Sequence, residues 1–411
     1  MPTSTAIRDF AKVVTTSGLT CPSCGQAGAR TFYEVLQIPT HNVKLMYSRE
    51  QALNCSKGDL RLALCAGCGF IWNSAFEPER VTYDDDYEST QAFSPTFNAF
   101  HDRLARQLVE RYDLVGKEVY EIGCGQGEFL TLLAEHGVAR AVGFDPTLRA
   151  DAVAPDGVTL VRDWYSEEYA DHAPDFVASK MTMEHIPDPG RFLGMLRRTM
   201  GDRPDAITFA MMPEARRVFE VCGFWDIYYE HCAYYTPGSL ARAFRLAGFD
   251  VFDLETAFGD HYCMLAARPG DGSGAPLPAE ETPEQLARII EDFVVEVARR
   301  RRRWTSWLKA EKSRGRRTVL WGGGSKGVAF LTTLKIEDEI EFAIDINPRR
   351  RGTFMAGTGQ EIATPERLEQ DRPDNVIIMS PVYADEIRAD LRARGLEPVI
   401  LSIEDVPGEP G

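Results

Sequence analysis

Two short cysteine motifs have the clearest capacity for chemistry in this sequence. Cys21-Pro22-Ser23-Cys24-Gly25 and Cys65-Ala66-Gly67-Cys68-Gly69 repeat one pattern. A Cys-x-x-Cys turn brings two thiolates within reach of one metal ion, and the following glycine permits that turn. Two pairs complete a closed tetrahedral sulfur site, which favours structural zinc over four unrelated buried cysteines. We therefore predict an N-terminal zinc ribbon with the ligands Cys21, Cys24, Cys65 and Cys68, and without Cys55.

A glycine-rich turn is the second motif. Glu121-Ile122-Gly123-Cys124-Gly125-Gln126-Gly127 ends a predicted strand and opens a predicted helix at Glu128. Such glycines let a ligand approach the backbone, and the acidic group can accept a hydrogen bond from a polar end of that ligand. The third glycine comes one position too early for the dinucleotide pattern. The acidic residue followed by Gly-x-Gly-x-Gly resembles the loop of class I methyltransferases, and this resemblance implies binding of S-adenosylmethionine (SAM) at Glu121, Gly123, Gly125 and Gly127.

Two further acidic residues extend this predicted donor site. Asp145 ends the next strand, where a carboxylate can hold the hydroxyls of a ribose. Asp163 and Trp164 follow the strand after that and are predicted to lie beside the adenine. For Asp163, a helix cap is an equally good interpretation.

A second glycine turn lies near the C-terminus. Trp321-Gly322-Gly323-Gly324-Ser325-Lys326-Gly327 follows a predicted strand, and free amides with a lysine suit a phosphate or another anion. We predict that Gly323, Ser325 and Lys326 contact the acceptor. The alternative is that this second unit is a degenerate Rossmann-like fold that serves only for packing. A nicotinamide-binding oxidoreductase fits less well, because the triple glycine departs from the dinucleotide pattern.

The elements that must position these motifs alternate between helix and strand. After a helix over 97–113, strands are predicted at 118–122, 141–145, 176–179 and 207–211, which is typical of a parallel sheet. A linker rich in Gly and Pro, a long helix over 283–314 and a second α/β unit follow. The predicted class is α/β, with a SAM-methyltransferase Rossmann-like core and a second Rossmann-like domain. The predicted boundaries are 15–90, 91–268, 269–316 and 317–408.

Charge and composition exclude several classes of partner. The 411-residue chain has a net charge of −16, which disfavours nucleic acid and anionic lipid surfaces. No apolar run reaches the ~20 residues of a membrane span, and Met1 to Thr20 does not read as a signal peptide. Nine cysteines without a secretory leader indicate thiols and metal ligands in the cytoplasm. The basic run 299–303 is interpreted as a solvated helix face, and the chain as a monomer or homodimer.

The order of these motifs resembles the three-domain sugar C-methyltransferases, which act on nucleotide-activated 4-keto-deoxysugars. The resemblance spans nearly the whole chain and is most specific at residues 225–234, Trp-Asp-Ile-Tyr-Tyr-Glu-His-Cys-Ala-Tyr. It implies that His231 is the base, with Glu230 and Tyr228 beside it. It also implies an aromatic residue in the pocket, for which Tyr83 and Tyr87 are the candidates.

The chain departs from that family at three places. Residues 35–42 replace a short stretch that usually bears Pro and Asn, and Ser380-Pro381-Val382-Tyr383 replaces a Trp-Asn pair. Glu184 precedes His185, where the family more often has a neutral residue. His185 is a second candidate base, and His261 is expected in a late antiparallel strand. These departures make the chain a divergent relative.

Methylation of carbon requires a base near neutral pKa and a group that stabilises the enolate. His231 meets the first need, and Glu230 or Tyr228 can orient it or polarise the carbonyl. The predicted function is SAM-dependent methylation of carbon beside a ketone, in a nucleotide-activated sugar or a similar metabolite of specialised or surface-glycan synthesis. Methylation of oxygen or nitrogen in a small metabolite is the second hypothesis. A non-catalytic SAM- and zinc-binding interaction protein is the third.

Overall fold

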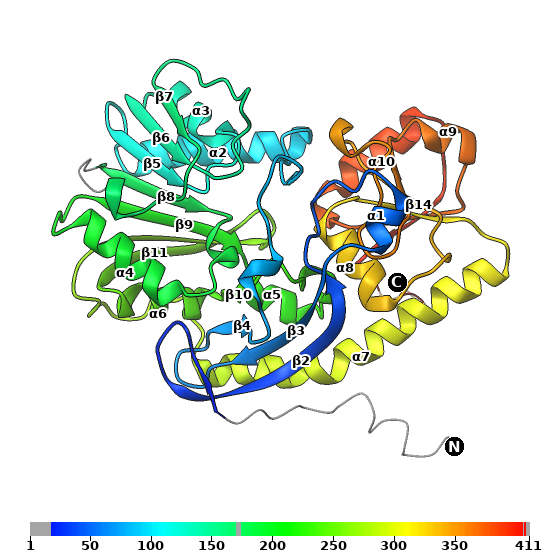
Figure 1. The fold of residues 1–411 in the computed structure, drawn as a ribbon, viewed down its shortest axis with the longest axis horizontal. Helices are drawn as coiled ribbons and strands as arrows, with labels where there is room; N and C mark the ends of the chain where they lie inside the picture. The colour runs from blue at the N-terminus through cyan, green and yellow to red at the C-terminus, as the bar shows by residue number, and fades with distance from the viewer. Residues whose placement is uncertain (1–17, 170–173, 406, 408–411) are drawn as a thin grey trace.

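The computed structural model describes residues 18–169, 174–405 and 407. Three predictions concern positions outside these residues. They are the start of the zinc module at Thr15, the interpretation of most of the stretch from Met1 to Thr20, and the end of the C-terminal domain at residue 408. Within them, no helix is both long enough and apolar enough to cross a bilayer. The α/β class, with two Rossmann-like units, is confirmed (Figure 1).

The N-terminal part forms a five-stranded antiparallel sheet that needs a strand from the core. Its order is β1-β2-β3-β4-β10, with bounds β1 Leu19–Thr20, β2 Ala27–Pro39, β3 Lys57–Leu64, β4 Ile71–Asn73 and β10 Ala233–Tyr234. Helix α1 (Arg49–Leu53) lies between β2 and β3. Trp72 of β4 pairs with Ala233 of β10, two residues after His231. The module therefore includes residues from far outside 15–90.

The core is a seven-stranded sheet of order β11-β12-β9-β8-β5-β6-β7. The five strands from β9 to β7 are parallel, and β11 and β12 add an antiparallel edge. Their bounds are β5 Glu118–Ile122, β6 Arg140–Phe144, β7 Val158–Val161, β8 Phe176–Lys180, β9 Ile207–Pro213, β11 Phe249–Ala257 and β12 Tyr262–Pro269. The predicted strand 118–122 is reproduced, and His261 lies in the turn just before β12 rather than in a strand.

Side-chain alternation along the strands assigns helices to the two faces of this sheet. Val119, Ala141 and Phe176 pack with α2 and α3, whereas Tyr120, Val142 and Val177 pack with α4 and α6. The helices of the core are α2 Pro95–Arg111, α3 Glu128–Glu135, α4 Pro189–Met200, α5 Ala215–Glu220 and α6 Pro237–Leu246. Short 3-10 turns include η3 (Met183–His185) and η4 (Phe224–Asp226).

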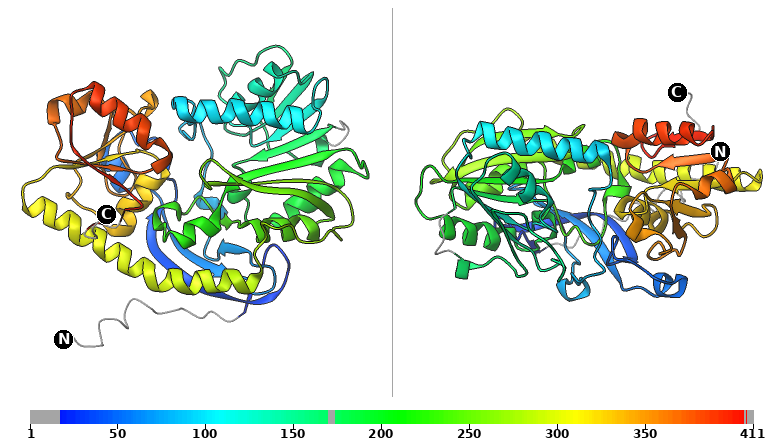
Figure 2. Two further views of the ribbon diagram at one scale, coloured as in Figure 1. Left: turned by 180° about the vertical axis from the view of Figure 1, so that it is seen from behind. Right: turned by 90° about the horizontal axis from the view of Figure 1, so that it is seen from above.

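The C-terminal unit is a five-stranded parallel sheet of order β15-β14-β13-β16-β17. Its elements are β13 Thr318–Trp321, α8 Ser325–Leu334, β14 Phe342–Ile344, β15 Glu361–Ala363, α9 Arg367–Asp371, β16 Asn375–Ile378, α10 Ala384–Ala393 and β17 Val399–Ser402. Helix α7 (Pro283–Ser313) runs along one side of the molecule and joins this unit to the rest (Figures 1 and 2).

The basic run on α7 is not simply a solvated face. Arg300 donates to the backbone carbonyls of Val221 and Glu404, and Arg301 donates to that of Thr333 at 2.9 Å. Only Arg299 and Arg302 are exposed. The sequence interpretation was therefore wrong for Arg300 and Arg301, because both donate hydrogen bonds to backbone carbonyls of other segments, at or near the ends of helices and in a loop.

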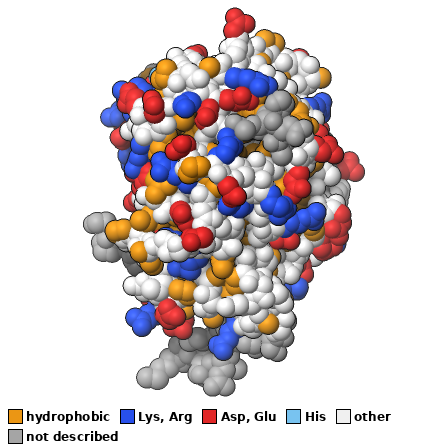
Figure 3. Space-filling model, turned by 90° about the vertical axis from the view of Figure 1, so that its left-hand side faces the viewer, with side chains coloured by type: hydrophobic (Ala, Val, Ile, Leu, Met, Phe, Trp, Pro, Cys, Tyr) orange, Lys and Arg blue, Asp and Glu red, His pale blue; other side chains and the backbone are white. Residues whose placement is uncertain are grey.

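Over one face of the core, acidic and basic side chains are interspersed (Figure 3).

Candidate active site

The two cysteine motifs fold into matching knuckles that face each other. Sγ of Cys21 lies 3.6 Å from Sγ of Cys68, and Cys24 and Cys65 are separated by the same distance. All four sulfurs lie within 4.8 Å of one another. Four sulfurs at ~2.3 Å from one ion are ~3.8 Å apart in a tetrahedron, so the arrangement fits a tetrahedral metal. In each knuckle the glycine after the second cysteine has a positive φ, which the turn requires.

A cleft of about 990 Å³ separates the core from the C-terminal unit. The carboxyl ends of the core strands, both glycine turns and the segment 81–94, here called the strap, line it. Parallel α/β sheets place ligands at this edge. The two glycine turns therefore open into one shared space.

The donor turn has the conformation that a closely approaching ligand needs. Gly123, Gly125 and Gly127 all have positive φ, and a Cβ on Gly123 would lie 2.0 Å from Oγ1 of Thr182. The Gly125 amide donates to Oδ2 of Asp145 at 2.8 Å, which holds this carboxylate beside the turn. The residues therefore fit a nucleoside with a polar tail.

Glu121 is the buried acid of the donor turn. Burial raises the pKa of its carboxyl to about 7, and Oε2 has no hydrogen-bond partner. Nζ of Lys180 is 3.9 Å from Oε1 and only loosely compensates this charge. A buried acceptor without a donor costs free energy, so an ammonium group from a ligand would stabilise it.

Asp163 and Trp164 reach the rim of the same cleft. Asp163 accepts from the Trp164 amide and from the Tyr169 hydroxyl, both at 2.8 Å, and it caps no α-helix of the described residues. The Trp164 side chain is 63% exposed and meets the ring of Tyr83 edge-on at 6.0 Å. An aromatic surface is thus available to a planar ring at this edge.

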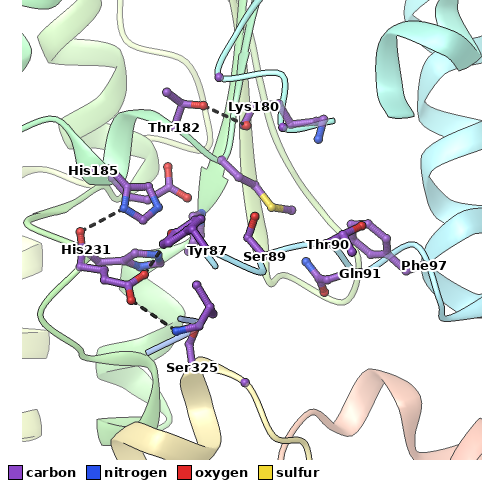
Figure 4. A pocket seen from close by; sticks show the side chains of 18 of the residues that line it. Tyr87, Ser89, Thr90, Gln91, Phe97, Lys180, Thr182, His185, His231 and Ser325 are labelled. Carbon is purple, nitrogen blue, oxygen red and sulfur yellow. Dashed lines mark hydrogen bonds between the residues drawn. The ribbon is translucent and has the colours of Figure 1, made fainter. Parts of the chain in front are cut away.

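His185 and His231 lie together in the cleft, with ring centroids 4.9 Å apart. Figure 4 shows the two imidazoles between Thr182 on the donor side and Ser325 of the C-terminal unit. Nδ1 of His185 lies 3.1 Å from the Glu230 carbonyl, and because a carbonyl only accepts, Nδ1 carries the proton. The Tyr83 hydroxyl is also 3.1 Å from this nitrogen.

Burial keeps both histidines neutral. It lowers the pKa of His185 to about 4, and burial together with nearby His185 and Lys326 holds the pKa of His231 well below its usual value. The Tyr228 ring packs on His231 at 4.2 Å, and burial raises the pKa of its hydroxyl well above the usual range. At neutral pH the cleft therefore offers unprotonated imidazole nitrogens beside a protonated phenol.

Glu230 is directed toward the strap and the N-terminal module. Its Oε2 accepts from the Tyr87 hydroxyl at 3.0 Å, and Oε1 accepts from the amides of Asn42 and Val43. Burial raises the pKa of Glu230 to about 7. The carboxylate therefore joins three segments around His231, and Asn42 belongs to the stretch in which the chain departs from the resembled family.

The C-terminal turn repeats the hydrogen bonds of the donor turn. The amide of Gly323 donates to Oδ2 of Asp345 at 3.0 Å, as Gly125 does to Asp145. Lys326 does not present a free charge, because Nζ pairs with the Asp226 carboxylate at 2.9 Å. Ser325 lies at the start of α8 and lines the cleft. An anion at this turn would meet backbone amides first.

Sequence reasoning missed Glu88, which is 1% exposed in the strap. Arg149 and Arg349 pair with its carboxylate at 3.1 and 2.9 Å. Arg149 lies four residues after Asp145, which is hydrogen-bonded to the donor turn, and Arg349 lies four residues after Asp345, which is hydrogen-bonded to the C-terminal turn. Asn347 donates to Oε1 at 3.1 Å. The repeated Asp-x-x-x-Arg spacing could have indicated that one anion lies between the two units.

Comparison with known proteins defines the class. Residues 97–254 match the methyltransferase domain family, and residues 275–397 match the C-methyltransferase C-terminal domain. C-methyltransferase NovU of Streptomyces niveus is 26% identical over 303 residues, which cover 69% of this chain and 71% of that protein. A ubiquinone biosynthesis O-methyltransferase of Neisseria meningitidis is 28% identical over 163 residues, covering 35% of this chain and 68% of its own length.

Among solved structures, a SAM-dependent methyltransferase from Mesorhizobium loti matches with 18% identity and a TM-score of 0.32, over 41% of this chain and 99% of its own. The family matches and the fold define this chain as a SAM-dependent methyltransferase. The order of a methyltransferase core followed by a C-methyltransferase C-terminal domain is the layout expected from the resembled three-domain C-methyltransferases, to which the chain is similar as a divergent relative.

A donor-turn variant tests the cofactor site. We expect Gly123→Ala to weaken binding of S-adenosylhomocysteine about 10- to 100-fold, because left-handed strain costs about 1–3 kcal/mol and the Cβ meets Thr182. Gly194→Ala is the control, since Gly194 lies inside α4 and its Cβ meets only the end of Arg198 at 3.4 Å. Calorimetry measures both. Unchanged affinity in Gly123→Ala would contradict the assignment.

Proposed function

We propose that this methyltransferase methylates carbon next to a ketone of a nucleotide-activated sugar or a similar small metabolite, with His231 as the general base. The observation that carries the proposal is the position of His231. It lies with Tyr228 and His185 in a cleft shared by the donor turn and the C-terminal turn. The similarity to C-methyltransferase NovU supports methylation of carbon. The reaction is proposed for specialised-metabolite synthesis in the cytoplasm, by a monomer or homodimer.

The donor residues are proposed to divide the cofactor among them. SAM, when bound, supplies an electrophilic methyl group on a sulfonium. The glycine turn would let the ligand lie against the backbone, and Glu121 would pair with its ammonium group. Asp145 would accept hydrogen bonds from the ribose hydroxyls, and Asp163 and Trp164 would lie beside the adenine. The residues assigned to this site are Glu121, Gly123, Gly125, Gly127, Asp145, Asp163 and Trp164.

A structural zinc ion is proposed at Cys21, Cys24, Cys65 and Cys68. The four-sulfur geometry supports it, and a site with four protein ligands leaves no position for substrate. Its role would be to hold the N-terminal sheet together. Through Arg242, which donates to the Cys68 carbonyl at 2.8 Å, the knuckle is also tied to α6 of the core.

Proton transfer is assigned to the imidazole of His231. Burial holds the pKa of His231 well below the near-neutral value expected of such a base, so the imidazole is a weaker base than expected. Its nitrogen is nevertheless unprotonated at neutral pH and can accept the proton of an acidic C–H bond. The protonated hydroxyl of Tyr228 can donate a hydrogen bond to the oxygen on which the enolate charge develops. Glu230 is a positioning residue, because its carboxylate bonds Tyr87 and the 42–43 backbone.

The acceptor is proposed to extend from the histidines toward the C-terminal turn. Ser325 can offer its amide to a phosphate, whereas the Gly323 amide would have to exchange Asp345, and Lys326 would have to exchange Asp226, for the ligand. Tyr83 and Tyr87, packed at 5.0 Å between centroids, form the wall on the strap side. A nucleotide-activated sugar suits this cleft, because its sugar would lie at the histidines and its phosphates at the C-terminal turn.

The pH dependence of donor binding tests Glu121. Its pKa of about 7 lies above the usual value for a carboxyl, so the group is neutral below pH 7 and ionised above it. We expect the affinity for S-adenosylhomocysteine to rise as the pH increases to about 7 and to level off above it, because only the ionised form pairs with the ammonium. Calorimetry on Glu121→Gln should show weaker binding without this pH dependence. The same pH dependence in both proteins would refute the pairing.

The acceptor is tested with SAM carrying a labelled methyl group and a panel of nucleotide-activated 4-keto sugars. Label fixed on carbon supports the proposal. Solvent exchange of an acceptor C–H proton without SAM would independently show enolate formation. Label on oxygen or nitrogen, without such exchange, would refute methylation of carbon and favour the second hypothesis. Donor binding without transfer to any sugar would refute the acceptor class.

A further inference from the structure

Glu184 is a buried acid that the proposed methyl transfer does not use. It is 3% exposed on η3, at the place where this chain departs from the resembled family. Oε2 has no hydrogen-bond partner among the described residues. A buried carboxylate oxygen without a donor or a counter-charge is costly, so such a group indicates a missing partner.

Two histidines complete a cluster with this carboxylate. One nitrogen of His185, one nitrogen of His231 and one oxygen of Glu184 all lie within 4.8 Å of one another. Because Nδ1 of His185 donates its proton to the Glu230 carbonyl, Nε2 keeps a free lone pair. A backbone acceptor on the other ring nitrogen is the usual support of a metal-binding histidine.

His231 is equally free to act as a ligand. Within the described part of the chain, neither of its ring nitrogens has a hydrogen-bond partner. The nearby cations are already paired: Lys326 with Asp226 at 2.9 Å, and Lys180 with Glu121 at 3.9 Å. These two carboxylates reduce the repulsion between the lysines and a cation at the cluster.

We propose that Glu184, His185 and His231 form a second metal site, which takes a divalent transition-metal ion such as Zn²⁺ or Co²⁺. Two imidazoles and one carboxylate are a suitable donor set for these ions, and three protein ligands leave positions open toward the cleft. This site differs from the four-cysteine site, which is closed and has sulfur ligands only.

The ion inhibits methyl transfer, a consequence that rests on the proposed role of His231. A ring nitrogen that binds a metal has no lone pair for a proton, and the other nitrogen of that imidazole carries hydrogen. Metal ion and acceptor C–H bond therefore compete for one lone pair. Metal binding itself does not depend on the identity of the acceptor.

Cobalt titration of the purified zinc-loaded enzyme tests the site. We expect one further equivalent of Co²⁺ to bind, with a weak d–d spectrum and without the thiolate charge-transfer band that the cysteine site would produce. Glu184→Gln should weaken this binding more than 100-fold, because losing even an outer partner of a metal ligand costs roughly 10–100-fold. His261→Ala is the matched control, since His261 lines the same cleft outside the cluster. Its cobalt affinity should equal that of the wild type.

Absence of the second equivalent, or its retention in Glu184→Gln, would overturn the site. Unchanged affinity of Glu184→Gln for S-adenosylhomocysteine shows that this variant is folded. Methyl transfer should fall as Co²⁺ binds to the wild type and recover with a chelator that leaves the cysteine-bound zinc in place. Stimulation by Co²⁺ would refute the inhibitory role. If no acceptor is methylated, the proposed function fails, while the titration still decides the metal site.

Discussion

Replacing His231 with alanine is expected to lower kcat for methyl transfer by about 10²–10⁴-fold, the contribution typical of a positioned general base. The side chain lies in the cleft with a free lone pair and a pKa well below its usual value, so its loss removes the acceptor for the C–H proton. The affinity for S-adenosylhomocysteine should change little, because His231 lies outside the donor turn. Single-turnover kinetics with labelled SAM measure the chemical step.

Two control variants separate this role from packing. His261→Ala removes another imidazole that lines the cleft and should keep most of the activity. Tyr228→Phe keeps the ring that packs on His231 at 4.2 Å and removes only the hydroxyl, so it should lower kcat and slow C–H exchange, but by less than His231→Ala does. If His231→Ala still exchanges the acceptor proton at the wild-type rate, His185 becomes the better candidate for the base.

The second large effect is expected at the cysteine knuckles. Cys65→Ser should release the metal and destabilise the protein by at least about 4 kcal/mol, the range associated with loss of a metal site. Activity should fall as well, because β4 pairs with β10 two residues after His231, and Asn73 donates to the Cys232 carbonyl at 2.9 Å. Zinc content by atomic emission and thermal unfolding measure the two effects.

Cys55→Ser provides the comparison. Cys55 is half-buried and lies outside the four-sulfur cluster, so its replacement should leave zinc content and activity unchanged. Treatment of the wild type with a strong chelator should reproduce the Cys65→Ser phenotype. A Cys65→Ser protein that keeps one zinc and the wild-type unfolding temperature would show that the knuckles do not hold the metal.

Local sequence patterns were sufficient for most elements. The strand 118–122 was predicted with the bounds that it has, and the predicted helix 283–314 differs from α7 by one residue. Apolar periodicity, glycine turns and caps act over a few residues, so they can be recognised without knowing the fold. The same holds for the cysteine knuckles, whose hydrogen bonds are formed within each motif.

Contacts between distant segments could not be predicted in this way. Glu230 was expected beside the base, yet its carboxylate bonds Tyr87 and the amides of residues 42 and 43. Lys326 was expected to be free for an anion and is instead paired with Asp226. Arg300 and Arg301 were expected to be solvated and instead donate hydrogen bonds to backbone carbonyls of distant segments. Each outcome depends on which surfaces meet after folding.

The sequence by itself determined the α/β class, the donor turn and the two cysteine knuckles, because each depends on short-range conformational preferences and spacing. Only the tertiary structure decided the rest of the site. It places Glu88 between Arg149 and Arg349, adds β10 to the N-terminal sheet, and brings Glu184 and His185 to His231. The physical reason is that burial and charge pairing depend on neighbours up to hundreds of residues away, and only chain folding chooses those neighbours.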